Sequence, residues 1–315
     1  MKHKVLDLFS GIGGFSLGLE RTGGFETVAF CELDKAAGRV LNKHWPNVPV
    51  YEDIKKVEAN ELRANGIVPD VICGGFPCQD ISKCGSGVNK GIHGERSGLW
   101  SEMFRLIRDV QPRYVIAENV SALRTRGLTL VVQNLCSIGY CVEWHCIPAS
   151  AVGAPHRRDR IWIIATSNSY SQSKSVVSEH DEASRLPSPL ANSNSAHGQG
   201  GGVSCRVHEE VTDADCRSLR GETTEVVANP SSKRREGSRE LKQPVRAKAI
   251  VNREAVKSFY GRIKQTWGSE PDVGRVAHGV PRRVDRLRQL GNAVVPQIPQ
   301  FIGECILDYE RGVDV

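Results

Sequence analysis

Apolar residues in the first half of the chain form short runs that alternate with segments of helical spacing. The runs typical of strands lie at residues 5–9, 27–30, 50–54, 70–73 and 114–117. The segments with helical spacing lie at residues 13–21, 35–45, 101–110 and 128–138. This alternation predicts an α/β fold in which a doubly wound, mostly parallel sheet is covered by helices on both faces.

Two more strand-like runs, residues 140–146 and 160–165, follow one another with no helical segment between them. Consecutive strands without a crossover helix pair in antiparallel fashion, because a parallel pair needs a long connection. We therefore predict a β-hairpin at one edge of the sheet, which a pure nucleotide-binding alternation would lack.

The composition changes sharply after Thr166. Between residues 167 and 258 the single aromatic residue is Tyr170, and Ser, Asn, Gly, Arg and Glu dominate. Recurring Asx- and Ser-rich units could each close a turn after a short strand. The small amount of apolar surface instead favours a flexible insertion over residues 167–250.

The last part of the chain regains apolar character. Residues 286–296 suggest a compact, turn-like element, and apolar positions at helical spacing follow from Ile298 to Tyr309. An amphipathic helix needs an apolar surface to cover, and the sheet of the first half offers one. The sequence thus predicts a main domain made of residues 1–166 and 285–315, and a small irregular region at residues 167–284.

The protein carries a net charge of +6, and basic residues gather in residues 253–288, before the last predicted helix. Charge alone leaves two interpretations open for this stretch, a solvated surface and a surface that binds phosphates.

Neither a signal segment nor a metal site is indicated. The amino terminus has no apolar signal core, and no apolar stretch approaches the length of a membrane span. We expect a cytoplasmic protein that does not contact a membrane. Cys73, Cys78 and Cys84 lack the Cys-x-x-Cys spacing of zinc ligands, so we expect no metal.

One cysteine stands where a nucleophile could be presented. Residues 70–73 form an apolar run, and Gly74, Gly75 and Pro77 then lead the chain to Cys78. Glycines permit a sharp bend and proline stiffens the backbone, so the thiol would stand on a rigid turn at the end of a strand. Thiolates are strong nucleophiles. A buried cysteine that only packs is the alternative.

A glycine-rich turn follows the first predicted strand. Residues 7–15 read as a strand end, a glycine turn and the start of a helix, where exposed backbone amides can hold a ligand. Glu32 ends the second predicted strand and Asp53 ends the third, where a carboxylate can bind ribose hydroxyls. A plain packing turn is the alternative for the glycines alone. The spacing fits a nucleoside, and the incomplete Gly-x-Gly-x-x-Gly pattern argues against a dinucleotide.

Three charged residues complete the set of candidate site residues. Glu118 ends the fifth predicted strand, beside the strand that leads to Cys78. A carboxyl near a thiol and away from water tends to have a raised pKa. Arg158 and Arg160 share one face of the last predicted strand, because alternate residues of a strand point the same way.

These features occur in one order along the chain. The motifs are Asp7–Phe15, Glu32, Asp53, Gly75–Gln79, Glu118–Val120, Arg158–Arg160 and Gly291–Val294. In this order they resemble the motif set of the DNA (cytosine-5)-methyltransferases, over residues 4–166 and 284–310. The resemblance implies the S-adenosylmethionine-dependent methyltransferase fold, with a target-recognition region at residues 167–284.

The resemblance also implies a reaction. Cys78 would add to carbon 6 of cytosine, Glu118 would hold ring nitrogen N3, and Arg160 with Arg158 would hold the O2 edge. S-adenosylmethionine would be the methyl donor, and no metal is implied. The residues that would bind this donor are Asp7, Phe9, Gly11, Gly13, Gly14, Glu32, Asp53, Ile54 and Asn292.

The implied partner is double-stranded DNA, from which the cytosine must be flipped out to reach the thiol. The residues expected to contact DNA lie after Cys78 and in the basic stretch: Gln79, Ser82, Lys83, Arg96, Arg262, Lys264 and Arg275. We expect a monomer that acts in restriction–modification or in phage self-protection. A cognate restriction endonuclease that shares the DNA site would be a further partner.

Three other functions fit part of the sequence. An enzyme with the same thiol chemistry on tRNA usually carries a Cys-Phe-Thr signature, which the chain lacks. A catalytically silent DNA-binding module would not require Cys78, Glu118 and Arg160 together. A nucleotide-dependent oxidoreductase is disfavoured by the spacing of the glycines.

Overall fold

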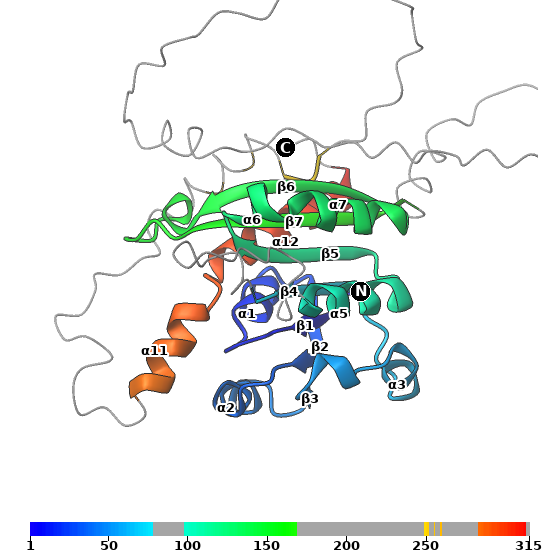
Figure 1. The fold of residues 1–315 in the computed structure, drawn as a ribbon, viewed down its shortest axis with the longest axis vertical. Helices are drawn as coiled ribbons and strands as arrows, with labels where there is room; N and C mark the ends of the chain where they lie inside the picture. The colour runs from blue at the N-terminus through cyan, green and yellow to red at the C-terminus, as the bar shows by residue number, and fades with distance from the viewer. Residues whose placement is uncertain (78–97, 169–248, 252–254, 256–258, 260–282, 313–315) are drawn as a thin grey trace, which may run out of the picture.

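A single seven-stranded sheet forms the centre of the computed structural model, which describes residues 1–77, 98–168, 249–251, 255, 259 and 283–312. The strand order is β3-β2-β1-β4-β5-β7-β6, and Figure 1 shows β3 and β6 at opposite edges. The strands are β1 (His3–Leu8), β2 (Phe25–Cys31), β3 (Val50–Tyr51), β4 (Val71–Gly75), β5 (Tyr114–Val120), β6 (Tyr140–Pro148) and β7 (Asp159–Ser167).

The first five strands pair in parallel, whereas β7 lies antiparallel between β5 and β6. The predicted doubly wound α/β sheet and its edge hairpin are therefore confirmed. Because β1, β2, β4 and β5 are parallel, their carboxyl ends lie together at one edge of the sheet. Ligands of such sheets bind at this edge.

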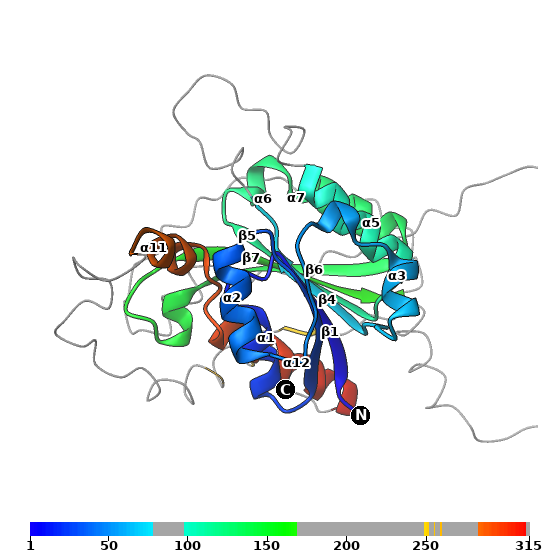
Figure 2. The same ribbon diagram turned by 90° about the horizontal axis from the view of Figure 1, so that it is seen from below.

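Helices cover both faces of the sheet (Figure 2). On one face, α3 (Ala59–Ala64), α5 (Gly98–Val110) and α7 (Leu128–Ser137) pack on a core that includes Trp100, Met103 and Leu135. On the other face, α1 (Gly14–Arg21) and α12 (Gln297–Arg311) pack on a second core. The remaining helical segments are α2 (Lys35–His44), η1 (Ile54–Lys56), α6 (Leu123–Arg126), η3 (Ala149–Val152) and α11 (Arg283–Asn292).

The last helix returns to the sheet, as its apolar spacing predicted. Phe301, Ile302 and Ile306 of α12 are buried in the same core as residues of α1. The backbones approach closely there, because a Cβ atom added to Gly18 would lie 2.2 Å from the carbonyl oxygen of Pro296. This contact fixes the chain from the start of α12 onwards against the first half of the molecule.

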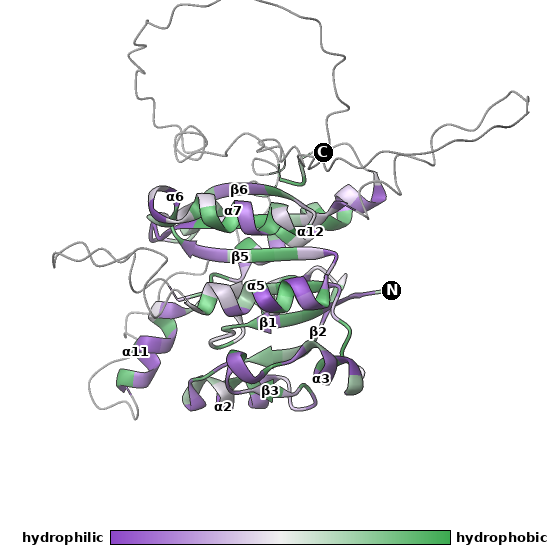
Figure 3. Cartoon of the chain, turned by 45° about the vertical axis from the view of Figure 1, so that its right-hand side comes forward, coloured by the Kyte–Doolittle hydropathy of each residue, from purple (hydrophilic) through white to green (hydrophobic). Residues whose placement is uncertain are grey.

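The segment before α12 differs from the prediction. Residues 283–292 form the helix α11, so the prediction of a turn-like element at residues 286–296 was wrong for residues 286–292. Residues 293–296 do lie in the turn between α11 and α12. Arg, Leu and Gln are good helix formers, and they extend the helix as far as Gly291 and Asn292. Figure 3 shows that α11 is mainly hydrophilic.

Part of the predicted target-recognition region also reaches the main core. Ile250, Val251, Ala255 and Phe259 are buried there, and the rings of Phe259 and Phe301 lie 4.8 Å apart. The buried carboxylate of Glu143 on β6 accepts hydrogen bonds from the amides of Ile250 at 3.1 Å and Val251 at 3.3 Å. Residues 169–248 and 260–282 lie outside the described residues, so the division into domains and the flexibility of 167–250 stay predictions. Among the described helices, none is long and apolar enough to cross a membrane.

Candidate active site

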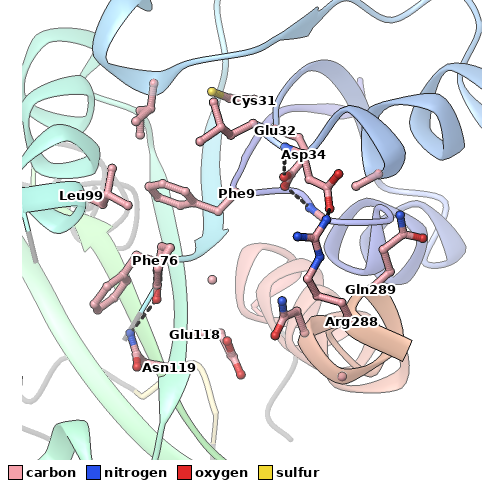
Figure 4. A pocket seen from close by; sticks show the side chains of 18 of the residues that line it. Phe9, Cys31, Glu32, Asp34, Phe76, Leu99, Glu118, Asn119, Arg288 and Gln289 are labelled. Carbon is pink, nitrogen blue, oxygen red and sulfur yellow. Dashed lines mark hydrogen bonds and ion pairs between the residues drawn. The ribbon is translucent and has the colours of Figure 1, made fainter. Parts of the chain in front are cut away.

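A cavity of about 740 Å³ lies at the carboxyl ends of the central parallel strands, where the sequence places its motifs. Its walls come from the ends of β1, β2, β4 and β5, from the start of β7 and from α11 (Figure 4). Six of the nine predicted cofactor-binding residues line it, namely Phe9, Gly11, Glu32, Asp53, Ile54 and Asn292. The cavity therefore brings together residues that are far apart in the sequence.

The carboxylate of Glu32 is held rigidly at the end of β2. Its Oε2 accepts a hydrogen bond from the amide of Gly11 at 2.7 Å, and its Oε1 accepts one from the amide of Asp34 at 2.8 Å. Each carboxylate oxygen can accept a second hydrogen bond. Glu32 can thus present both oxygens to paired hydroxyl groups in the cavity.

Asp53 and Phe9 flank Glu32. The side chain of Asp53 accepts a hydrogen bond from the amide of Lys55 at 3.0 Å and so begins the 3₁₀ helix η1. Phe9 adopts a positive φ of 54°, which is uncommon for a residue with a side chain, and its ring faces the cavity (Figure 4). An apolar ring near fixed carboxylates suits a ligand that combines a flat base with a sugar.

Three residues predicted to bind the cofactor lie behind the cavity wall instead. Asp7 is buried, and its Oδ2 accepts a hydrogen bond from the hydroxyl of Ser16 at 2.8 Å. Burial raises the pKa of Asp7 to about 7. Gly13 has a positive φ of 84° and faces Trp45, and Gly14 lies against the backbone of Val294. Their contact with a cofactor stays a prediction, and their positions favour an indirect part in shaping the loop.

An ion pair between two of the predicted catalytic residues also lines the cavity. The Nε atom of Arg160 lies 2.8 Å from Oε1 of Glu118. Burial raises the pKa of Glu118, while the positive charges of Arg160 and Arg158 oppose this rise. Gly75 pairs with Glu118 across the sheet, and a Cβ atom there would lie 3.0 Å from Oε2 of Glu118. The missing side chain of Gly75 leaves room for this carboxyl.

The prediction that Arg158 and Arg160 share one strand face was wrong, because β7 begins at Asp159 and Arg158 lies before it. The two arginines also have different contacts. Arg158 adopts a positive φ of 39°, and its guanidinium donates hydrogen bonds to the carbonyl oxygens of Gly291 at 2.8 Å and Ala293 at 2.7 Å. Arg158 therefore holds the turn between α11 and α12, whereas Arg160 pairs directly with Glu118.

Asn119 belongs to the Glu118–Val120 motif, but the sequence analysis assigned it no role. It is 2% exposed, and its Nδ2 donates a hydrogen bond to the carbonyl oxygen of Phe76 at 3.0 Å. Its Oδ1 accepts a hydrogen bond from the amide of Val120 at 2.9 Å. Asn119 thereby holds the peptide that leads into Pro77 and the candidate nucleophile. A second polar residue directly after Glu118, in a strand that begins with an apolar run, was the signal that could have revealed it.

Comparison with known proteins assigns the chain to a family. The profile of the C-5 cytosine-specific DNA methylase family matches residues 3–269, which is most of the chain. The chain belongs to this family. The resemblance seen in the ordered motifs is therefore confirmed.

Individual methylases match over part of their length. The chain is 35% identical over 190 residues to the type II methyltransferase M2.BsuMI of Bacillus subtilis, covering 57% of the chain and 46% of that protein. It is 37% identical over 168 residues to the type II methyltransferase M.PspPI of Psychrobacter sp., covering 51% and 39%. Among solved structures, a variant of Spodoptera frugiperda DNMT2 is similar at 22% identity and a TM-score of 0.45, covering 53% and 50%. The chain thus spans about half the length of the curated methylases it matches.

Several predicted site residues of this chain lie outside the described residues. They are the candidate nucleophile and all the residues predicted to contact DNA: Cys78, Gln79, Ser82, Lys83, Arg96, Arg262, Lys264 and Arg275. Pro77, which precedes Cys78 in the sequence, lines the same cavity as Glu118. Within the described residues, no group of His, Cys, Asp and Glu side chains could hold a metal ion.

Proposed function

We propose that this protein transfers a methyl group from S-adenosylmethionine to carbon 5 of a cytosine that is flipped out of duplex DNA. One observation carries the proposal. A single cavity joins the nucleoside half around Glu32 and Asp53 to the half around Glu118 and Arg160, and Pro77, the residue before Cys78, lines the same cavity. Membership of the methylase family and the type II methyltransferases among the relatives support the same reaction.

The residues of the first half fit an adenosine-containing methyl donor. Each carboxylate oxygen of Glu32 accepts a hydrogen bond from a backbone amide, which orients the side chain to bind the two ribose hydroxyls. Phe9 and Ile54 offer apolar surface for the adenine ring. S-adenosylmethionine supplies an electrophilic methyl group when it is bound.

The second half fits the cytosine ring. The thiolate of Cys78 adds to carbon 6, which gives carbon 5 the nucleophilic character that the free base lacks. Glu118 shares a proton with ring nitrogen N3, and its raised pKa favours the protonated form that this hydrogen bond requires. Arg160 balances the negative charge at the O2 edge. After methylation, loss of the proton from carbon 5 breaks the bond between Cys78 and carbon 6.

The positions of Arg158 and Asn119 suggest supporting parts in this reaction. Asn119 holds the carbonyl oxygen of Phe76, two residues before Cys78 in the sequence. Arg158 holds the turn that carries Asn292 to the cofactor half. We assign both to positioning. This differs from the direct contact with the base that the sequence analysis expected of Arg158.

The proposed setting is restriction–modification or phage self-protection, with the protein acting as a monomer. In this setting a restriction endonuclease with the same recognition sequence would be its partner. The recognition sequence itself would be read by residues of the predicted target-recognition region.

Methyl transfer from labelled S-adenosylmethionine tests the proposal. The purified protein is incubated with duplex DNA of mixed sequence or with tRNA, and the nucleosides are analysed by mass spectrometry. We expect 5-methylcytosine in DNA and none in tRNA, and no product with Glu118→Ala. Labelled tRNA without labelled DNA, or a methyl group at another atom of the base, would overturn it.

A further inference from the structure

Helix α11 forms a wall of the cavity although no apolar core holds it. None of its described residues is buried, and Val284, Leu287 and Leu290 are 77%, 44% and 53% exposed. Four residues at its carboxyl end nevertheless line the cavity: Arg288, Gln289, Gly291 and Asn292. Helices of soluble proteins are usually held by an apolar face, so polar contacts must contribute to the position of α11.

The surroundings of the chain change from open to tightly packed between Gly291, near the end of α11, and Val294. A Cβ atom added to Gly291 would meet no atom within 4 Å, whereas one added to Gly14 would lie 2.6 Å from the carbonyl oxygen of Val294. Between these two positions, the guanidinium of Arg158 donates hydrogen bonds to the carbonyl oxygens of Gly291 and Ala293. Residues 291–293 therefore have the properties of a hinge between α11 and the firmly packed α12.

An ion pair joins α11 to Asp34, the residue that precedes α2. The guanidinium of Arg288 pairs with the carboxylate of Asp34 (Figure 4). Asp34 is itself well fixed, because its side chain accepts a hydrogen bond from the amide of Ala36 at 2.8 Å at the start of α2. The backbone amide of Asp34 donates a hydrogen bond to the carboxylate of Glu32. Arg288 thus attaches α11 directly beside the carboxylate that we assign to the ribose.

We propose that the ion pair between Arg288 and Asp34 is a latch that keeps the cofactor half of the cavity closed. When the latch opens, α11 turns about residues 291–293, which admits S-adenosylmethionine and releases S-adenosylhomocysteine. This inference rests on the proposed function in one respect, the identity of the ligand. Arg288 is 58% exposed and Asp34 27%, and an ion pair of such exposure changes an equilibrium by about two- to fivefold.

The variants Arg288→Gln and Asp34→Asn test the latch. Asn keeps an oxygen that can begin α2, and Gln keeps most of the length of the Arg side chain. Arg286→Gln is the matched control, because Arg286 is an exposed residue of the same helix that does not line the cavity. The first readout is the rate at which S-adenosylhomocysteine dissociates, measured by stopped-flow displacement. The second is hydrogen exchange of the α11 amides without ligand.

We expect both Arg288→Gln and Asp34→Asn to release S-adenosylhomocysteine about two- to fivefold faster than the wild type. The double variant should release it no faster than either single variant, and Arg286→Gln should match the wild type. Salt should accelerate release from the wild type more than from the double variant, because it screens the ion pair. Exchange in α11 should rise by a similar factor in the single variants.

Equal release rates and equal exchange in Arg288→Gln and the wild type would overturn the latch. A wild type that binds no S-adenosylhomocysteine would instead overturn the proposed function. Hydrogen exchange would then still decide whether Arg288 holds α11, because it needs no ligand.

Discussion

Replacing Asn119 by Ala tests how the candidate nucleophile is positioned. The substitution removes the hydrogen bonds to the carbonyl oxygen of Phe76 at 3.0 Å and from the amide of Val120 at 2.9 Å. Asn119 is 2% exposed and its hydrogen bond to Phe76 is buried, so the carbonyl oxygen of Phe76 would lose this partner in a buried site. A buried polar group without a partner costs about 1–3 kcal/mol, and we expect the free energy of unfolding to fall by an amount of this order.

The larger effect should be on catalysis. The peptide bonded by Asn119 leads through Pro77 to Cys78, and a displacement of about 1 Å at a reacting atom lowers the rate roughly 100-fold. We expect the kcat of Asn119→Ala for methyl transfer to fall by about this factor, while the Kd for S-adenosylhomocysteine changes little. Radiolabel transfer to duplex DNA measures the rate, and calorimetric titration measures the Kd.

A matched control separates positioning from general stability. Asn134 on α7 accepts a hydrogen bond from Nε1 of Trp100 at 3.0 Å and does not line the cavity. Asn134→Ala should lower the free energy of unfolding without lowering kcat. If kcat falls equally in both variants, or falls in neither, the positioning role of Asn119 is refuted.

Two further substitutions test the first half of the cavity and its support. Glu32→Ala should weaken the binding of S-adenosylmethionine by about 1–3 kcal/mol, because ribose hydroxyls lose their acceptor, and an unchanged Kd in calorimetry would contradict the ribose assignment. Because burial raises the pKa of Asp7 from its usual value to about 7, the folded state binds more protons than the unfolded state between about pH 4 and 7. The free energy of unfolding should therefore fall as the pH rises through this range. Urea denaturation of Asp7→Asn should show a smaller fall, and an identical slope would count against the buried-carboxyl argument.

The architecture followed from local patterns. Buried parallel strands are apolar along their whole length, so residues 70–73 and 114–117 indicated strands without knowledge of their neighbours. The hairpin of β6 and β7 was indicated by the missing helix between two strand-like runs. The short helix α3 was not predicted, because its six residues give too few apolar positions to show a helical period.

The site was predictable where a motif lies at a strand end. Glu32 and Glu118 follow apolar runs directly, and parallel strands bring such ends together. The contacts of Arg158, Asn119 and Arg288 could not be read in this way, because each depends on a partner distant in sequence or on a backbone carbonyl. From the sequence, the side chain of Arg158 could contact either a base or the chain itself. Its hydrogen bonds to the carbonyl oxygens of Gly291 and Ala293 show that it contacts the chain.

Trapping the covalent adduct decides whether Cys78 performs the chemistry proposed for the cavity. Duplex DNA that contains 5-fluorocytosine cannot lose its carbon 5 substituent after methylation, so the bond between enzyme and base should persist. The adduct formed with S-adenosylmethionine is isolated, digested and mapped by mass spectrometry, with Cys84→Ser as the control that should still be trapped. We predict one adduct, at Cys78, which disappears in Cys78→Ser. An adduct at Cys73 or Cys84, or methylated DNA from Cys78→Ser at the wild-type rate, would contradict the proposed reaction.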